Sequence, residues 1–381
     1  MEEWKKYKMS DFIDFNPTVS LKKGTVARKI TMDKLIPHSR DIYDWEYEPY
    51  SGGSKFQNGD TIMARITPCL ENGKHAFISL LNDGETAYGS TEYIVMRGIP
   101  GISDNRFVYY LSHFPDFKNA AVKSMVGSSG RQRAQVDVLK NLEFYLPGLK
   151  EQRKIADTLS TLDDKIALNN RINHNLEEQA RIQFEAWCAK CVESKLIREL
   201  SSNILDYTPN NHKKVILLNS SDVTEGRFES LPFVDNQNLK GQFKKRFMKG
   251  DILYSEIRPR NHHFAICYFD ADEYIASTRL MVIRKNEKEI SSDALLYQYL
   301  LMPSVLEEFT SKTESRSGTF PQGNYDDLSS SEVPYSSDNL QIGKALDAIY
   351  GVIWANMEEN KRLASIRDSL LPQLMSGLIT C

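Results

Sequence analysis

The sequence lacks any apolar run long enough to span a lipid bilayer, so no transmembrane helix is predicted. Its first six residues lead into no apolar signal segment. Hydrophobic residues make up 41% and charged residues 26% of the 381 positions, which is typical of a soluble globular protein. We therefore expect a cytoplasmic protein of two or three domains that has no membrane partner.

Cysteine is scarce, and the five cysteines, an odd number, are scattered along the chain. This pattern argues against a disulfide framework. Cys188 and Cys191 are separated by two residues, but a structural zinc site usually needs a second such pair. The adjacent His262 and His263 would point to opposite faces of a strand and would not converge on one ion. We therefore expect no metal site, and a surface or DNA-facing role for the two histidines.

Several enzyme signatures are also absent. The sequence contains no phosphate loop, no glycine-rich dinucleotide fingerprint and no nucleophile elbow of the form Gly-x-Ser-x-Gly. Residues 16–19, Asn-Pro-Thr-Val, share only two positions with the Asn-Pro-Pro-Tyr tetrapeptide of amino-methyltransferases, and we interpret them as a turn. Pro115-Asp116 has no Glu-x-Lys at a useful distance to complete a nuclease motif. We therefore expect a chain with no catalytic residues and no cofactor of its own.

The chain also lacks an overall excess of positive charge, since its formal net charge is −3. Proteins that bind nucleic acids often show a basic excess. Any DNA-binding function of this chain must therefore rest on local clusters of basic and polar residues.

What the sequence does contain is a long heptad pattern between residues 151 and 190. No Pro or Gly interrupts this stretch, so a continuous helix of about forty residues, roughly 60 Å long, is predicted. Residues at alternating steps of four and three form a single seam, as in a coiled coil. The seam consists of Ile155, Leu159, Leu162, Ile166, Asn169, Asn173, Leu176, Ala180, Gln183 and Trp187.

The C-terminal part of the chain repeats this seam 187 positions later. Both seams carry two Asn residues at the same layers, and a buried polar residue fixes register and partner at a cost in stability. We predict that the helices pair with each other antiparallel, so that Asn169 faces Asn360 and Asn173 faces Asn356. Two amphipathic helices packed on separate cores are the alternative. The second seam consists of Ile342, Leu346, Ile349, Ile353, Asn356, Asn360, Leu363, Arg367, Leu370 and Leu374.

The duplication extends beyond the helices. Residues 59–68 match residues 250–259 at an offset of 191, and residues 90–97 match residues 277–284 at an offset of 187. We interpret the chain as a tandem duplication of a globular domain followed by a long helix. The expected fold class is α+β, with two pseudo-twofold-related, mixed but mostly β domains separated by an antiparallel coiled coil. The expected boundaries are 1–147 and 193–335 for the globular domains, and 148–192 and 336–381 for the helices.

Strands are predicted where β-branched and aromatic residues cluster, and helices where the apolar period is near 3.6 residues. The predicted strands are 61–66, 75–80, 92–97 and 143–146 in the first domain, and 215–218, 251–254, 264–269 and 279–284 in the second. The predicted helices are 105–114, 116–126 and 293–309, the last of them broken near Pro303.

Basic and amide side chains gather in equivalent loops of the two repeats, and in a lysine-rich stretch of the second repeat. Arg reads guanine bidentately, Asn and Gln read adenine, and Lys, Ser and Thr hold phosphates. Because these loops differ between the repeats, we predict that they read two different sequences; a solvated charged rim without a ligand is the alternative. The candidate DNA-binding residues are Arg65, Thr67, Asn72, Lys74, Arg131, Gln132, Arg133, Lys244, Lys245, Arg246, Arg258, Arg260, Asn261, His262, Arg316, Thr319, Phe320 and Gln322.

Several short motifs, taken in order, resemble those of the specificity (S) subunits of type I restriction–modification systems, and the resemblance covers nearly the whole chain. The motifs are Gly59-Asp60, residues 66–74 (Ile-Thr-Pro-Cys-Leu-Glu-Asn-Gly-Lys), residues 89–93 (Gly-Ser-Thr-Glu-Tyr), Leu146-Pro147, residues 151–156 (Glu-Gln-Arg-Lys-Ile-Ala), residues 162–166 (Leu-Asp-Asp-Lys-Ile) and residues 370–377 (Leu-Leu-Pro-Gln-Leu-Met-Ser-Gly). The second repeat departs from the family pattern. Asp338-Asn339 stands where the first repeat has Glu151-Gln152, and residues 71–74 have no counterpart.

The resemblance implies a non-catalytic subunit in which each domain reads one half of a bipartite target in double-stranded DNA. It also implies that the coiled coil sets the gap between the halves, and that two modification (methyltransferase) subunits dock on the assembly. A restriction (motor-nuclease) subunit would join the complex, and S-adenosylmethionine would be bound by the methyltransferase partner. A protein–protein scaffold without nucleic acid and a stand-alone endonuclease are the alternative hypotheses.

Overall fold

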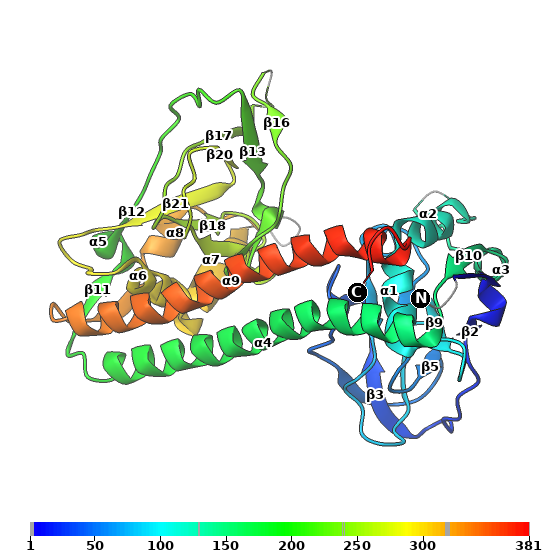
Figure 1. Ribbon diagram of the computed structural model, residues 1–381. Coiled ribbons are helices and arrows are strands. Elements are labelled where there is room, and N and C mark those ends of the chain that lie inside the picture. Colours follow the sequence, from blue (N-terminus) through cyan, green and yellow to red (C-terminus); the bar gives the residue numbers. More distant parts are fainter. Residues whose placement is uncertain (1–3, 129, 238, 240, 317–320, 381) are drawn as a thin grey trace. The chain divides into compact units, whose positions relative to one another are not determined.

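The computed structural model describes residues 4–128, 130–237, 239, 241–316 and 321–380. The chain divides into two compact units: unit 1 comprises Met1–Asn170 and Glu358–Cys381, and unit 2 comprises Arg171–Met357. Each unit holds one globular part together with one half of each long helix (Figure 1). Among the described residues, no helix combines the length and the apolar character that a membrane crossing needs.

Unit 1 contains two four-stranded sheets and one short strand pair. The first sheet is antiparallel and has the strand order β2 (Ile13–Phe15), β9 (Tyr93–Gly98), β6 (Thr61–Ala64), β7 (His75–Phe77). The second sheet has the order β4 (Glu46–Pro49), β3 (Val26–Ile30), β8 (Ala87–Gly89), β5 (Ser54–Phe56), with β3 and β8 parallel. The strand pair consists of β1 (Lys5–Lys8) and β10 (Glu143–Leu146). The helices are η1 (Met9–Asp11), η2 (Met32–Lys34), α1 (Asn105–His113), α2 (Pro115–Lys123) and α3 (Val136–Lys140).

Unit 2 repeats this topology. Its first sheet has the order β12 (Ser201–Asn203), β21 (Leu280–Lys285), β18 (Ile252–Ser255), β19 (Phe264–Ile266), and its second has the order β16 (Val234–Asp235), β13 (Lys214–Leu218), β20 (Tyr274–Ser277), β17 (Phe243–Lys245). The strands β13 and β20 are parallel, as are β3 and β8 in unit 1. The strand pair is β11 (Glu193–Leu196) with β22 (Glu332–Tyr335), and a hairpin of β14 (Val223–Thr224) and β15 (Arg227–Phe228) is added. The helices are α5 (Ile197–Leu200), η3 (Ser220–Asp222), η4 (Pro259–Asn261), α6 (Asp293–Leu300), α7 (Pro303–Arg316) and α8 (Tyr325–Ser329). The predicted α+β class is therefore confirmed, and the shared strand order supports a duplication.

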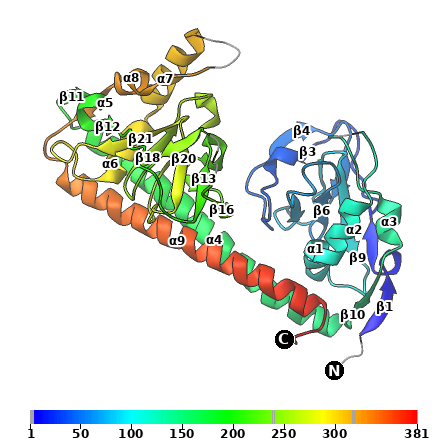
Figure 2. The ribbon, with the colours of Figure 1, turned by 90° about the horizontal axis from the view of Figure 1, so that it is seen from above.

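The central strand of each unit separates two apolar cores. Met63 of β6 packs into the core that contains the helices, whereas its neighbour Ile62 packs into the core between the two sheets. In unit 2, Tyr254 and Leu253 of β18 divide between two cores in the same way. Successive side chains of a strand point to opposite faces, so a strand with both faces buried becomes a continuous apolar run. Figure 2 shows α1 beside β9 in unit 1, and α6 beside β21 in unit 2.

The repeated Gly-Asp motif begins this central strand for a steric and an electrostatic reason. Gly59 has a φ of +90°, and a Cβ placed there would lie 2.7 Å from the Asn105 side-chain nitrogen. Gly250 has a φ of +94° and the same kind of crowding. The Asp60 carboxylate is fully buried and pairs with Arg97, with 2.6 Å between Oδ1 and Nε. Asp251 and Arg284 form the same pair in unit 2, also at 2.6 Å.

The two long helices are α4 (Leu149–Cys188) and α9 (Leu340–Met375), and they run antiparallel within each unit. In unit 1, Asn169 Nδ2 donates to Asn360 Oδ1 at 2.9 Å. In unit 2, Asn356 Nδ2 donates to Asn173 Oδ1 at 2.8 Å. Both pairings are those predicted from the sequence, and both predictions are confirmed. Every predicted seam residue is buried or half-buried, so the seam is the interface between the helices.

An amide side chain holds the start of each long helix to its own unit. Gln152 is fully buried; its Oε1 accepts from the Asp104 backbone at 2.9 Å, and its Nε2 donates to the Ile102 and Pro147 carbonyls at 2.9 Å. Asn339 makes the same kind of contacts in unit 2, accepting from the Ser291 backbone at 3.0 Å. The departure of Asp338-Asn339 from the family pattern therefore keeps the hydrogen bonding of Gln152 with a shorter side chain.

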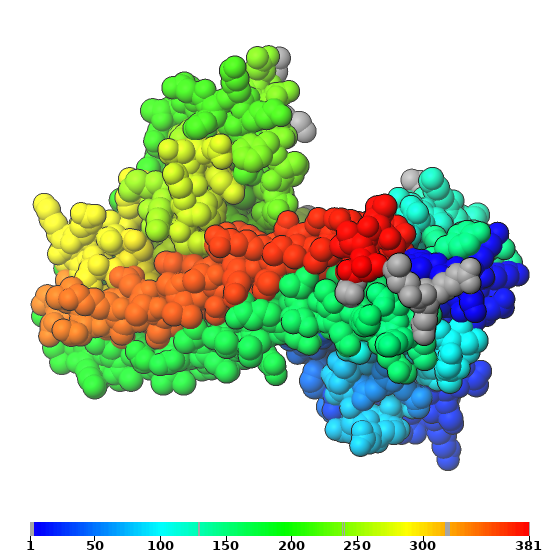
Figure 3. Space-filling view, viewed as in Figure 1, coloured from blue at the N-terminus to red at the C-terminus, as the bar shows by residue number. Residues whose placement is uncertain are grey.

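The helix pair is charged at one layer of unit 1 and neutral at the equivalent layer of unit 2. Arg367, although it lies in the predicted apolar seam, is buried and pairs with Asp163 at 2.6 Å between Nη1 and Oδ1. The Tyr110 hydroxyl donates to the other carboxylate oxygen at 2.6 Å. In unit 2 the equivalent positions are Ala180 and Tyr350, both buried in one apolar core. Tyr350 belongs to the first half of α9. Figure 3 shows that half, in orange, directly against the yellow residues of the unit 2 globular part.

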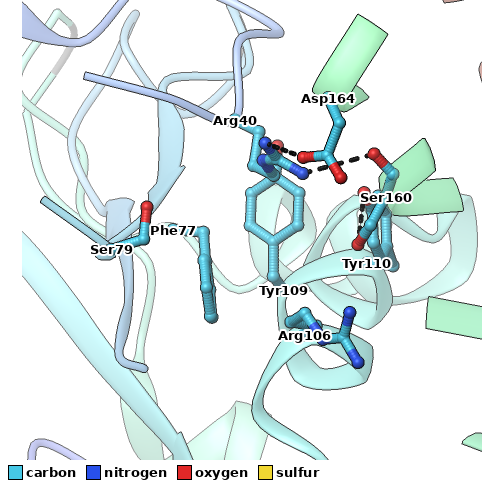
Figure 4. Close-up of a pocket in the computed structure, with 8 residues that line it drawn as sticks. All are labelled: Arg40, Phe77, Ser79, Arg106, Tyr109, Tyr110, Ser160 and Asp164. Atoms are coloured by element: carbon cyan, nitrogen blue, oxygen red, sulfur yellow. Dashed lines mark hydrogen bonds and ion pairs between the residues drawn. The ribbon is translucent and has the colours of Figure 1, made fainter. Parts of the chain in front are cut away.

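Arg40 forms a second polar connection between the unit 1 globular part and α4. Its Nη2 lies 2.7 Å from Asp164 Oδ1 and 3.0 Å from Asp41 Oδ2, and Nη1 donates to the Ser160 carbonyl at 3.4 Å. Figure 4 shows the guanidinium pointing at the helix beside Tyr110, next to a cavity of about 190 Å³. These contacts, together with the Asp163 layer, specify which half of α4 packs on this globular part.

We expect Asp163→Ala to destabilise unit 1 by about 3–5 kcal/mol, because it leaves the Arg367 guanidinium buried without its ion-pair partner. The double variant Asp163→Ala/Arg367→Met should recover most of this loss, because no uncompensated charge remains. Urea unfolding of the full chain, followed by circular dichroism, measures both effects. A double variant no more stable than Asp163→Ala alone would show that the loss arises from packing. Tyr350→Phe, at the neutral layer of unit 2, is the matched control and should cost only about 1 kcal/mol.

Candidate nucleic-acid interface

The two polar loops predicted in the first repeat are brought together as a short antiparallel pairing in unit 1. The Thr67 backbone donates to the Gln132 carbonyl at 3.0 Å, and the Ala134 backbone donates to the Arg65 carbonyl at 2.8 Å. Residues 65–67 continue from β6, and residues 131–134 lead into α3. We call these two segments the unit 1 edge.

The same pairing recurs in unit 2. The Arg258 backbone donates to the Pro321 carbonyl at 3.0 Å, and the Gly323 backbone donates to the Glu256 carbonyl at 2.8 Å. Residues 256–258 continue from β18, and residues 321–323 lead into α8. We call these two segments the unit 2 edge. Each edge joins segments far apart in sequence, which is how separate loops can act on one ligand.

The candidates in unit 1 differ in how available their side chains are. Arg131 and Asn72 are exposed, and Arg65, Thr67 and Gln132 are half-buried. Arg133 is held bidentately by Glu92, with Nη2 and Nε at 2.7 and 2.9 Å from Oε1. The Lys74 ammonium donates to the Met32 carbonyl at 2.8 Å. The candidates of unit 1 thus include an exposed Arg131 on the edge and an exposed Asn72 outside it, whereas the Lys74 ammonium bonds within the fold.

The candidates in unit 2 divide in the same way. Those exposed to solvent are Lys244, Arg258, Arg260, Asn261, His262 and Arg316. Arg258 and His262 adopt left-handed backbone conformations, with φ of +48° and +52°, at the two ends of η4. Such backbone strain at non-glycine residues is typical of binding and active sites. Half-buried are Arg246 and Gln322, whereas Thr319 and Phe320 lie outside the described residues.

Two exposed arginines of this set are paired with carboxylates. Arg260 lies 2.8 Å from Glu314 through Nη2, and Arg316 lies 2.6 Å from Asp327 through Nη2. His262 Nδ1 is 3.4 Å from Glu225 Oε1. Among the described residues, no group of three or more His, Cys, Asp or Glu side chains is arranged to hold a metal ion.

Lys245 is a core residue and does not belong to the unit 2 surface. Its side chain is buried, and Nζ donates to the Leu280 carbonyl at 2.7 Å and lies 3.8 Å from Glu256 Oε1. Burial lowers the pKa of this ammonium, while the nearby Glu256 carboxylate raises it. Lys245 is therefore not part of the proposed interface, because its ammonium is buried within unit 2.

The equivalent positions of the two edges carry different charges. Arg65 in unit 1 corresponds to Glu256 in unit 2, as shown by their matching backbone bonds at 2.9 Å to Glu92 and to Arg279. Glu92 thereby corresponds to Arg279. Arg133 corresponds to Gln322, because Arg133 forms an isolated antiparallel β-bridge with Ile66 and Gln322 forms one with Ile257. Glu92, Glu256 and Arg279 were not among the predicted candidates: acidic residues were not sought at these loops, and Arg279 was assigned to the predicted strand 279–284.

Residues 1–178 match the family described as type I restriction modification DNA specificity domain. Over these residues the chain is therefore similar to that domain. This result confirms the resemblance inferred from the sequence motifs. Unit 2 lies almost wholly outside the matched residues, and it shares the strand order of unit 1.

Relatives of the specificity domain include two characterised subunits. The type I restriction enzyme HindI specificity subunit of Haemophilus influenzae is 36% identical over 163 residues, which is 42% of this chain and 35% of that protein. The EcoAI specificity subunit of Escherichia coli is 28% identical over 169 residues, covering 44% of this chain and 28% of that protein. The alignments thus span about a third or less of the length of these relatives.

A solved structure shares the fold. The crystal structure of a type I restriction-modification system S subunit from M. genitalium aligns over 98% of this chain and 96% of its own length, with a TM-score of 0.56 and 15% sequence identity. At this identity the likeness concerns the fold, and it extends to both units.

We expect Glu92→Gln to strengthen binding of mixed-sequence duplex DNA at low salt severalfold, because it removes a negative charge and frees Arg133 for a phosphate. Fluorescence anisotropy with a labelled duplex measures this change. The melting temperature should shift little, because an ion pair at a partly exposed surface position contributes little to stability. Arg279→Gln, at the equivalent position of unit 2, is the matched control and should weaken binding. Unchanged affinity in both variants would contradict the placement of DNA on these edges.

Proposed function

We propose that this chain is the DNA-recognition subunit of a type I restriction–modification complex, and that each unit reads one half of a bipartite duplex target. The observation that carries this proposal is the pair of edges. They share one backbone topology but carry different charged groups at three equivalent positions. A duplicated scaffold with divergent edges suits two different sequences, and the specificity domain of residues 1–178 supports DNA as the ligand.

The exposed side chains of the edges and of the neighbouring candidate loops have the chemistry needed to read base edges in the major groove. Arg131 and Arg258 can donate two hydrogen bonds to guanine, and Asn72 and Asn261 can bond adenine bidentately. Each good bidentate pair discriminates against a wrong base by about 1–3 kcal/mol. Exposed lysines such as Lys244 supply phosphate contacts, which add affinity but no sequence information.

We further propose that the paired helices set the gap between the two half-sites. The 40 residues of α4 and the 36 residues of α9 are uninterrupted helices, and their seam residues are buried against each other. Half-sites read from the same face of a duplex lie about 34–36 Å apart, one helical turn. A paired helix resists compression and bending better than a flexible linker, so it suits a fixed spacing.

The same proposal assigns the chemistry to partners. Two methyltransferase subunits would bind the assembly together with a restriction subunit, and S-adenosylmethionine would be held by the methyltransferase. This chain would be non-catalytic, because extraction and methylation of a base need a pocket and a methyl donor that the partner would supply.

Selection from randomised duplexes, with and without a methyltransferase partner, tests the proposed function. We expect enrichment of two short conserved blocks separated by a fixed gap. Each unit would select one block, and the helical spacer would set the length of the gap. Selection with an Arg131→Gln variant should relax the sequence in one block only, and Arg258→Gln should relax the other. Failure to enrich any bipartite sequence in the presence of the partner would favour a protein–protein scaffold.

The spacer is tested by inserting one heptad in both helices, between Asn170 and Arg171 and between Met357 and Glu358. Seven residues add about 10.5 Å of helix and keep both seams in phase. The preferred gap should grow by about three base pairs, since the duplex rises about 3.4 Å per pair. The same heptad placed in α4 alone is the control: it should misalign the asparagine layers and lower the melting temperature. Retained modification with an unchanged gap would contradict the spacer role.

A further inference from the structure

Unit 1 contains a polar cleft of about 360 Å³ beside its edge, where the loop after β2 approaches β5, β9 and the end of β6. Its lining includes the cations Lys55 and Arg65 and the hydroxyl side chains of Thr18, Ser54, Thr91 and Tyr93. No Asp or Glu is among the described residues that line it. The cleft is therefore a concentration of hydrogen-bond donors and positive charge without a carboxylate.

Neither cation of the cleft is neutralised by the described part of the chain. The Arg65 Nε is buried and has no hydrogen-bond partner among the described residues. The Lys55 ammonium lies over the Tyr50 ring, 5.5 Å from its centroid. The Glu92 carboxylate, whose backbone carbonyl accepts from the Arg65 backbone, is occupied by Arg133. Two cations left facing one cleft call for an anionic ligand, because unpaired charges in a partly buried site are costly.

A buried hydroxyl points to the same requirement. Tyr93 is 2% exposed, and its hydroxyl has no hydrogen-bond partner among the described residues. The ring is fixed in place: a Cβ at Gly89 would lie 2.7 Å from Tyr93 Cε2 and 2.2 Å from the Ile30 carbonyl oxygen. Buried polar groups are hydrogen-bonded in the great majority of cases, so Tyr93, which lines the cleft, carries a hydroxyl donor that the described part of the chain leaves unsatisfied.

The equivalent place in unit 2 serves as an internal comparison, and there the charges cancel. Glu256 takes the place of Arg65, and Lys245 of β17 lies 3.8 Å from its carboxylate. Leu280 takes the place of Tyr93, and its carbonyl accepts from Lys245 Nζ at 2.7 Å. Unit 2 therefore satisfies its own polar groups at this place, whereas unit 1 leaves its groups open.

We propose that the cleft of unit 1, lined by Lys55, Arg65 and Tyr93, binds a phosphate group, and that the equivalent place in unit 2 does not. A phosphate offers three strong acceptor oxygens and up to two negative charges, which match two cations and several hydroxyl donors. The phosphate comes either from the DNA backbone or from a small free ligand. The first source rests on the proposed DNA recognition, whereas the second is independent of it.

The first experiment uses inorganic phosphate as the probe and the full chain as the protein. Thermal unfolding with increasing phosphate, against sodium chloride at equal ionic strength, should show a saturable rise in the melting temperature. Arg65→Gln should abolish the rise, Arg65→Lys should retain part of it, and Glu256→Gln, the matched control in unit 2, should keep it in full. Tyr93→Phe should weaken phosphate binding severalfold without lowering the melting temperature of the phosphate-free protein, because its hydroxyl has no partner there.

The second experiment distinguishes the two sources. The affinity for duplex DNA is measured over a range of salt concentrations, and each DNA phosphate that the protein neutralises steepens the plot of log K against log salt by about 0.9. If the cleft holds a DNA phosphate, Arg65→Gln should make the slope shallower by about that amount and Glu256→Gln should not. An unchanged slope together with a saturable effect of inorganic phosphate assigns the cleft to a small free ligand.

The proposal is overturned if inorganic phosphate has no effect beyond that of chloride and Arg65→Gln leaves the salt slope unchanged. It is also overturned if Glu256→Gln and Arg65→Gln behave alike in both experiments. If the full chain binds no duplex at all, the proposed DNA recognition fails, but the phosphate titration still decides on the cleft. Should Arg65→Gln fail to fold, Lys55→Gln, which removes the other cation of the cleft, takes its place in both experiments.

Discussion

The two asparagine layers fix the register on which the other contacts of the long helices depend. Asn169 bonds Asn360 in unit 1, and Asn173 bonds Asn356 in unit 2. An apolar seam alone would tolerate a slip by one heptad, since Leu and Ile can replace one another between layers. A slipped Asn would face an apolar residue, and a buried amide without a partner costs about 1–3 kcal/mol. The correct register in turn brings Arg367 to Asp163, an ion pair that would be costly in any other position.

The features that the two units share are buried and fully bonded, and those in which they differ lie at the edges. The ion pair of Asp60 with Arg97 recurs in unit 2 as Asp251 with Arg284. The hydrogen bonds of Gln152 at the start of α4 recur in unit 2 at Asn339. Loss of either would leave a buried charge or amide without its partner, so both repeats must retain them. Exchange of Arg65 for Glu256 at the edge leaves the backbone pairing unchanged. Such a fold can therefore change its ligand chemistry without changing its core.

Much of this fold could be predicted because its main determinants are periodic or repeated. The seam positions and the facing of the Asn pairs follow from heptad spacing, and the helix break near Pro303 follows from the missing backbone donor of proline. The strands β6, β9, β18 and β21 were predicted because they are buried on both faces and read as apolar runs.

The short strands and several site contacts could not be predicted. The strands β4 and β5 contain charged and small residues, and only the tertiary pairing with β3 and β8 makes them strands. The burial of Lys245 was not predictable, because a lysine within a basic run is expected at the surface. Only the tertiary structure brings the Leu280 carbonyl within hydrogen-bond distance of its ammonium. Glu92 was missed because acidic residues were not sought at a DNA-facing edge, although the offset between the repeats aligns it with Arg279.

The local ion pairs of the exposed or half-buried arginines bear on the proposed specificity. Arg133, Arg260 and Arg316 are each held by a carboxylate, so part of the positive charge is neutralised within the fold. A single phosphate contact offers such an arginine little gain over the carboxylate that it already binds. Guanine differs from both anions in that its O6 and N7 acceptors identify one base. Under the proposed DNA recognition, the carboxylates would therefore lower the affinity for any duplex, and only a matching base would return sequence-specific hydrogen bonds.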